Sequence, residues 1–305
     1  MAPDPLAAGE HLIDVDGRPQ WYHVAGRGPV CLVHPGGPGL GWEYLRMPAL
    51  EAHLTVVYLE PIGTGRSARF DHADDYSIDR YTEFLGRVLD HLTVPAPLLL
   101  GHSHGGFVAQ RYALSHPERL GGLVLYATSP ATGADFWTSA VTNVQLFPQQ
   151  YPDRAAAADI PPAFQAALAA DTDEAYTAAL RRLLPVYLAN PWGEESLLPA
   201  VRQGLHAWVA PARAQEPRPF NVRASLTGLT VPSLILAGAH DFICGPRWAQ
   251  ALTATIPGAR LVTFDDSGHL AHLEEADTFA TTVTGFAELH APRPSRPLPG
   301  RESTS

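Results

Sequence analysis

The stretch Leu98-Leu99-Leu100-Gly101-His102-Ser103-His104-Gly105-Gly106 decides the fold of this chain. Its apolar start predicts a buried strand, and a helical pattern follows from about Gly105 to Ser115. Gly101 and Gly105 stand two residues either side of Ser103, so the chain can pass through a tight turn. In such a strand–turn–helix element the serine is strained, and its hydroxyl projects above the sheet. We predict that Ser103 is a nucleophile; the alternative is a serine in an ordinary glycine-rich turn.

Short apolar runs alternate with helical patterns along the rest of the chain. The chain opens on a strand pair at 12–15 and 21–25, and near-continuous apolar runs follow that suit strands buried on both faces of a parallel sheet. We expect these strands at 30–33, 55–59, 97–100, 123–126, 233–236 and 260–264, and helices at 78–92, 105–115, 247–256 and 274–289. The alternation predicts an α/β fold, with a mostly parallel sheet and helices on both faces.

This regularity stops between residues 129 and 225, a stretch that is rich in Ala, Pro, Gln and Trp. We interpret 129–225 as a helical cap inserted between two sheet strands, which leaves 1–128 and 226–290 as the core. Residues 291–305 are rich in Pro and Arg, and we expect a disordered tail. Several cap aromatic residues either line an apolar substrate pocket or form the core of the cap itself: Trp137 and Trp192, which we take as substrate-binding candidates, and Phe136, Phe147 and Trp208.

A serine nucleophile needs a histidine base and an acid that orients it. Asp241 follows the expected strand that ends near Ala237, and His269 follows the one that ends at Phe264. The carboxyl ends of parallel strands meet at one edge of the sheet, where open α/β folds place their sites. We therefore predict a triad of Ser103, His269 and Asp241.

Other residues compete for these roles. His272, His102 and His104 are alternatives to His269, and Asp265 or Asp266 could replace Asp241 as the acid. A metal site is a further alternative, but no carboxylate–histidine spacing resembles a ligand set.

Acyl transfer also needs backbone N–H donors for the tetrahedral oxyanion. The first is expected from His104, directly after the nucleophile. The second is expected from the loop after strand 30–33, which reads His34-Pro35-Gly36-Gly37-Pro38-Gly39.

At this point a family resemblance is evident in the first loop, the turn around Ser103 and the segment Ser267-Gly268-His269. The chain resembles the α/β-hydrolase superfamily, and within it the proline iminopeptidase-like group, over roughly residues 20–128 and 226–290. Proteins of this group carry H-G-G-P-G, D-Q-R-G-x-G-x-S, G-x-S-x-G-G and S-G-H segments. The resemblance implies the α/β-hydrolase fold with an inserted cap.

When Gly36-Gly37-Pro38-Gly39 is aligned with the G-G-P-G of the family loop, the resemblance implies that the N–H of Gly37 is the second oxyanion donor, with that of Gly36 as the alternative. Two departures weaken the inference to a peptide substrate. Pro35 stands where the family has its histidine, and Glu60-Pro61-Ile62 replaces the D-Q-R triplet.

Composition excludes several other classes of function. The net charge is −10, which argues against nucleic-acid and anionic-membrane binding. All 21 basic residues are arginine, so chemistry that requires a lysine Schiff base is excluded. Cys31 and Cys244 do not form a disulfide framework. With no signal peptide and no long apolar run, we expect a cytoplasmic protein.

We predict a serine hydrolase that cleaves a small or medium carboxylic ester or lactone through an acyl-enzyme, without a metal or organic cofactor. One alternative is a proline iminopeptidase that releases N-terminal proline from a short peptide, with Glu194 and Glu195 binding the ammonium group; such paired acids also occur on solvent-facing helix starts. The other alternative is a non-hydrolytic member of the fold.

Overall fold

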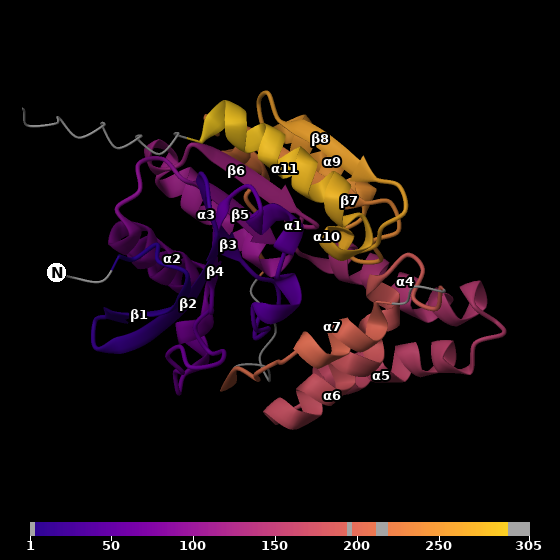
Figure 1. The fold of residues 1–305 in the computed structure, drawn as a ribbon. Helices are drawn as coiled ribbons and strands as arrows, with labels where there is room; N and C mark the ends of the chain where they lie inside the picture. The colour runs from indigo at the N-terminus through magenta and orange to yellow at the C-terminus, as the bar shows by residue number, and fades with distance from the viewer. Residues whose placement is uncertain (1–3, 194–196, 212–218, 292–305) are drawn as a thin grey trace, which may run out of the picture.

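The computed structural model describes residues 4–193, 197–211 and 219–291, and one sheet of eight strands runs through them (Figure 1). The strand order is β1-β2-β4-β3-β5-β6-β7-β8. β2 pairs antiparallel with β1 and β4, and all other neighbours are parallel. The strands are β1 Gly9–Val15, β2 Arg18–Gly26, β3 Val30–His34, β4 Thr55–Leu59, β5 Leu98–His102, β6 Gly122–Tyr126, β7 Ser233–Gly238 and β8 Arg260–Phe264. The predicted mostly parallel α/β fold is confirmed.

Helices are present at the expected ranges 78–92, 105–115 and 247–256, and further helices occur along the chain. They are α1 Pro48–Glu51, α2 Ile78–Leu92, α3 His104–Ser115, α4 Ala134–Gln150, α5 Ile160–Ala169, α6 Asp173–Leu183, α7 Leu198–Gly204, α8 Arg223–Leu226, α9 Pro246–Thr255, α10 Ala271–Glu274 and α11 Ala276–His290. Short 3-10 helices occur at Glu43–Leu45, Ala73–Tyr76, Pro117–Arg119, Ala155–Asp159 and Leu184–Tyr187. The hydroxyl of Ser77 accepts the N–H of Arg80 and so caps the start of α2.

The expected single helix at 274–289 was wrong, because the structure has two helices there. Glu275 separates α10 from α11 with a non-helical backbone, φ −128° and ψ 52°. Its carboxylate accepts hydrogen bonds from the Ser267 hydroxyl at 2.6 Å and from the Asp266 N–H at 3.2 Å. The break therefore ties the start of the last helix to the loop that carries His269.

Side-chain alternation along the strands divides the core into two clusters. In β3, Leu32 belongs to the same buried cluster as residues of α2, α3 and α9, whereas Cys31 and Val33 belong to the cluster that contains residues of α1 and α11. These two helix groups cover opposite faces of the sheet (Figure 1). Cys31 and Cys244 are both buried and free.

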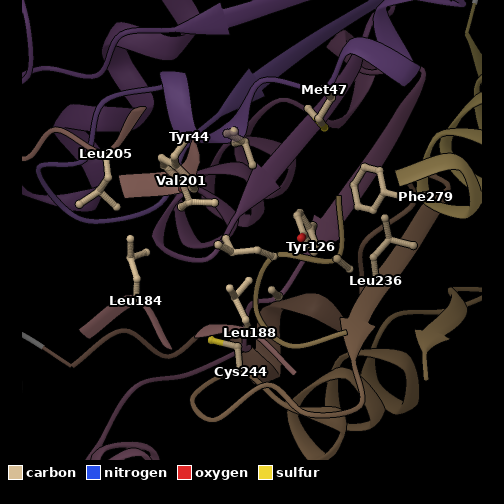
Figure 2. Packing of buried hydrophobic residues seen from close by; sticks show 14 of the residues in the cluster. Tyr44, Met47, Tyr126, Leu184, Leu188, Val201, Leu205, Leu236, Cys244 and Phe279 are labelled. Atoms are coloured by element: carbon tan, nitrogen blue, oxygen red, sulfur yellow. The ribbon is translucent and has the colours of Figure 1, made fainter. Parts of the chain in front are cut away.

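The inserted helices, α4 to α7, leave the sheet after β6 and return before β7 (Figure 1). They share a core with one face of the sheet, since Leu184, Val201 and Leu205 belong to the same buried cluster as Tyr44 and Tyr126 (Figure 2). In the described part of the chain, no helix has the length and apolar character needed to cross a membrane.

Candidate active site

Ser103 is the single residue between β5 and α3, and its backbone has a strained conformation with a positive φ of 53° and a ψ of −116°. The glycines around it are required by space: a Cβ on Gly101 would overlap the carbonyl oxygen of Gly105, and a Cβ on Gly105 would overlap that of His34. The Ser103 N–H donates to the Tyr126 carbonyl at 2.9 Å, and Thr128 donates to the Ser103 carbonyl at 2.8 Å. The turn is thus held in its strained form from the neighbouring strand.

Two of the predicted polar residues meet at the same sheet edge. Nδ1 of His269 donates to Oδ2 of Asp241 over 2.7 Å, and both side chains are buried. The other carboxylate oxygen of Asp241 accepts the N–H groups of Ile243 and Cys244, each at 2.9 Å. These three groups fix the acid, and they leave Nε2 of His269 as the nitrogen available for proton transfer.

The alternatives to this pair are either exposed or buried with other partners. Asp265 and Asp266 are solvent-exposed on the loop before His269. His102 bonds through Nδ1 to the Tyr44 hydroxyl at 2.8 Å, and burial holds its pKa well below the usual histidine range. His272 donates from Nε2 to the Tyr44 carbonyl at 3.0 Å, and burial lowers its pKa to about 4. His104 packs its ring edge-on against Tyr81, 5.1 Å away.

Ser103 and His269 line one cavity of about 160 Å³ at the meeting point of the sheet and the inserted helices. Among the described residues no hydrogen bond joins the Ser103 hydroxyl to His269. Gly36 and Gly37 line the same cavity, and Gly36 lies against Ser103, since a Cβ on Gly36 would be 3.0 Å from the Ser103 Cβ.

The N–H groups of Gly36 and Gly37, the two candidate oxyanion donors of the first loop, differ in whether they already have a hydrogen-bond partner. The N–H of Gly36 donates to the Tyr44 hydroxyl at 2.8 Å and is already used. Gly37 has a φ of 126°, and a Cβ there would lie 2.7 Å from the N–H nitrogen of Gly39. His104 is the first residue of α3, so its N–H has no partner one turn back in the helix. Gly37 and His104 therefore remain the oxyanion candidates.

Glu60, which stands where the family carries the Asp of its D-Q-R triplet, has a structural role. Its buried carboxylate accepts the N–H groups of Arg66 at 2.5 Å and Ser67 at 2.9 Å, and so closes the turn after β4. Burial raises the pKa of Glu60, while these two hydrogen bonds lower it. The residue supports the turn and does not line the cavity.

The inserted helices form an apolar wall of the cavity, which we define as Phe164, Ala167 and Leu168 of α5 and Leu180 and Leu183 of α6. Of the two predicted substrate-binding tryptophans, Trp137 lines the cavity and is 38% exposed. Trp192 is not brought to the cavity; it packs against Phe147 and Tyr151. Glu194 and Glu195 lie outside the described residues. No Asp, Glu or Arg is among the described residues that line the cavity.

Sequence reasoning missed the groups that hold the backbone of His269. Its N–H donates to the carbonyl of Tyr187 at 2.7 Å, and its carbonyl accepts from Nε2 of His102 at 3.1 Å and from the hydroxyl of Tyr126 at 3.2 Å. The tyrosines come from distant segments without a motif, so no local pattern marks them.

Comparisons with known proteins agree with this fold. The model of the alpha/beta hydrolase fold family matches residues 29–276. A 2-hydroxymuconate semialdehyde hydrolase of Pseudomonas sp. strain CF600 is 30% identical over 274 residues, which cover 87% of this chain and 88% of that protein. A proline iminopeptidase of Saccharolobus solfataricus is 26% identical over 298 residues, which cover 88% of this chain and 87% of that protein. The structure of the esterase RhEst1 from Rhodococcus sp. ECU1013 matches with a TM-score of 0.70 and 20% identity over 91% of this chain and 97% of that one.

Proposed function

The chain belongs to the α/β-hydrolase family, and we propose that it is a serine hydrolase that cleaves a small or medium carboxylic ester or lactone. The observation that carries the proposal is the buried hydrogen bond between His269 and Asp241 in the cavity that Ser103 lines. In this proposal the inserted helices act as the cap that selects the substrate.

The proposed reaction has two halves. The Ser103 oxygen attacks the carbonyl carbon while Nε2 of His269 takes the hydroxyl proton, and the N–H groups of Gly37 and His104 bind the oxyanion. The C–O bond then breaks, and the alcohol leaves with the proton from His269. Water, activated by His269, attacks the acyl-enzyme and releases the carboxylic acid. Asp241 holds the imidazole in the required tautomer throughout.

The cavity favours an uncharged group over an ammonium group. An aminopeptidase has to compensate the charge of the substrate amino terminus with a carboxylate or several carbonyl oxygens. The described lining offers an apolar wall and no carboxylate. This composition suits the apolar part of an ester or lactone.

Proline iminopeptidase activity is the second candidate, because relatives with that name align along most of the chain. It requires acids from the cap, and Glu194 and Glu195 are the candidates for that role. A non-hydrolytic role on the same scaffold is the third possibility.

The test compares wild type with Ser103→Ala on a short-chain nitrophenyl ester and a proline arylamide. Ester cleavage that disappears in the variant, with the arylamide untouched, supports the proposed function. Ser103-dependent arylamide cleavage would establish the aminopeptidase instead, and Glu194→Gln with Glu195→Gln would then test ammonium binding. Equal inactivity of both proteins on both substrates would contradict hydrolysis of either class.

A further inference from the structure

A continuous hydrogen-bonded line connects the glycine loop to His269 behind Ser103. It begins at the N–H of Gly36, which donates to the Tyr44 hydroxyl at 2.8 Å, and continues from that hydroxyl to Nδ1 of His102 at 2.8 Å. Nε2 of His102 then meets the carbonyl oxygen of His269 at 3.1 Å. We propose that Tyr44 and His102 are positioning residues, which fix His269 relative to the Gly36–Gly37 loop. The inference rests on the proposed triad and adds two residues to it.

The protons of this line can be assigned without conflict. The Tyr44 hydroxyl accepts the Gly36 N–H, so its single proton is donated to His102. Nδ1 of His102 is then an acceptor, and its proton lies on Nε2, where the His269 carbonyl needs a donor. Burial favours the uncharged form of both side chains, since it raises the pKa of Tyr44 and lowers that of His102. Each group in the line therefore has its partner.

A second branch reaches the same carbonyl from the other side. The Tyr126 hydroxyl lies 3.2 Å from the His269 carbonyl and 3.0 Å from Nδ1 of His272. Nε2 of His272 donates to the Tyr44 carbonyl at 3.0 Å. Tyr44 is therefore held by its backbone as well as by its hydroxyl. The Tyr126 hydroxyl has one proton, which it donates either to Nδ1 of His272 or to the His269 carbonyl, so the second branch supports the backbone of the proposed base without closing a ring of simultaneous hydrogen bonds.

The network is almost wholly buried, although Tyr44 and His102 line the cavity. Tyr44 is 6% exposed and His102 is 1% exposed. Figure 2 shows Tyr44 beside Val201 and Leu205, and these residues belong to one buried cluster. A lost hydrogen bond here leaves a buried polar group without a partner, so the chain has to shift. Small shifts of a base or an oxyanion loop reduce the rate strongly, because both act through geometry.

The experiment measures the rate at which a fluorophosphonate with an uncharged alkyl chain labels Ser103. This reaction needs the base and the oxyanion loop but not the natural substrate. The variants are Tyr44→Phe, His102→Gln and His102→Asn. The Gln amide reaches the place of Nε2 and keeps a donor toward His269, whereas the Asn side chain reaches only the place of Nδ1. Tyr58→Phe is the matched control: this buried hydroxyl accepts the Met47 N–H and donates to Glu51, away from the cavity.

We expect labelling to slow about tenfold in Tyr44→Phe and His102→Asn and less in His102→Gln, with Tyr58→Phe within twofold of wild type. The Tyr44→Phe/His102→Asn double variant should be no slower than the slower single variant, because both break one line. Ester turnover should show the same loss in kcat, with KM nearly unchanged. Wild-type rates in folded single variants, or multiplied losses in the double variant, would overturn the inference alone. Absence of labelling in wild type would overturn the proposed triad, and with it this inference.

Discussion

The backbone N–H of His269 donates to the carbonyl oxygen of Tyr187 at 2.7 Å, which joins the proposed base to the segment of the inserted helices. Glu274 strengthens the junction, because its carboxylate accepts the N–H of Gly268 at 2.7 Å and that of Ala189 at 2.6 Å. The loop of the base and the inserted helices therefore cannot move independently without breaking buried hydrogen bonds.

Gly268→Ala tests this junction. A Cβ on Gly268 would lie 2.5 Å from the Tyr187 carbonyl oxygen and 3.0 Å from the carbonyl carbon of Leu188, both of them backbone atoms that cannot rotate away. We expect Tm to fall by about 5 °C and kcat by about tenfold. Gly285→Ala in α11 is the control, because a Cβ there meets nothing within 4 Å and alanine favours a helix. A wild-type kcat and Tm in Gly268→Ala would contradict a rigid junction.

Asp241→Asn tests the assignment of the acid. The Asn oxygen can still accept the N–H groups of Ile243 and Cys244, but its NH₂ group then faces Nδ1 of His269 and favours the wrong tautomer. We expect kcat/KM for an ester to fall by about 10⁴, with the fold intact by circular dichroism. Asp265→Asn and Asp266→Asn should stay within about twofold of wild type, because both side chains are exposed. Loss of activity in either of these variants would move the acid role to that residue.

The sequence predicts the sheet and the polar residues at its edge because both depend on local patterns. Ser103, Asp241 and His269 each follow a short apolar run, so the common edge of a parallel sheet brings them together. The partners that hold His269 depend on tertiary packing: Tyr126 is 143 residues away in sequence. The break at Glu275 was missed for the same reason, since its side chain bonds to a loop before the helix.

The lining of the cavity was harder to predict than its polar residues. Leu180 and Leu183 belong to an amphipathic helix whose apolar face looks alike whether it meets a core or a cavity. Trp137 and Trp192 are both aromatic residues of the inserted segment, yet only Trp137 is among the described lining residues. Periodicity identifies the apolar face of a helix, but tertiary packing decides what that face contacts.

The free energy of unfolding should decrease on the acidic side because of buried histidines, which include His102 and His104 as well as His34 and His272. Burial lowers the pKa of both His34 and His272 to about 4, from the usual 6.5. Between these values the unfolded chain binds protons that the folded protein excludes, so stability decreases as pH falls from about 6.5 to 4. We expect Tm to drop by at least roughly 5 °C between pH 7 and pH 5.

The contribution of His34 to this acid sensitivity is measured as the slope of Tm against pH. His34→Gln should lower Tm at pH 7 but reduce its dependence on pH between 7 and 5, because the ring that excludes the proton is gone. His53→Gln is the control, since His53 is exposed in the folded protein as it is in the unfolded chain. An unchanged slope in His34→Gln would show that the carboxylates and the other histidines account for the acid sensitivity.

The size of the cavity predicts the acyl chains that the enzyme prefers. Its volume of about 160 Å³ is close to that of an engineered apolar cavity of about 150 Å³ that binds benzene. Along a series of nitrophenyl esters from acetate to decanoate, kcat/KM should rise with each methylene and peak at about four to six acyl carbons. Leu180→Ala removes part of the apolar wall and should move the peak toward longer chains by about two carbons. Leu146→Ala is the control: this α4 side chain is 42% exposed and is not among the lining residues, so the peak should stay in place. An unmoved peak in Leu180→Ala would mean that the apolar wall holds the leaving alcohol, and the same variant assayed against a series of alkyl acetates would then show the shift.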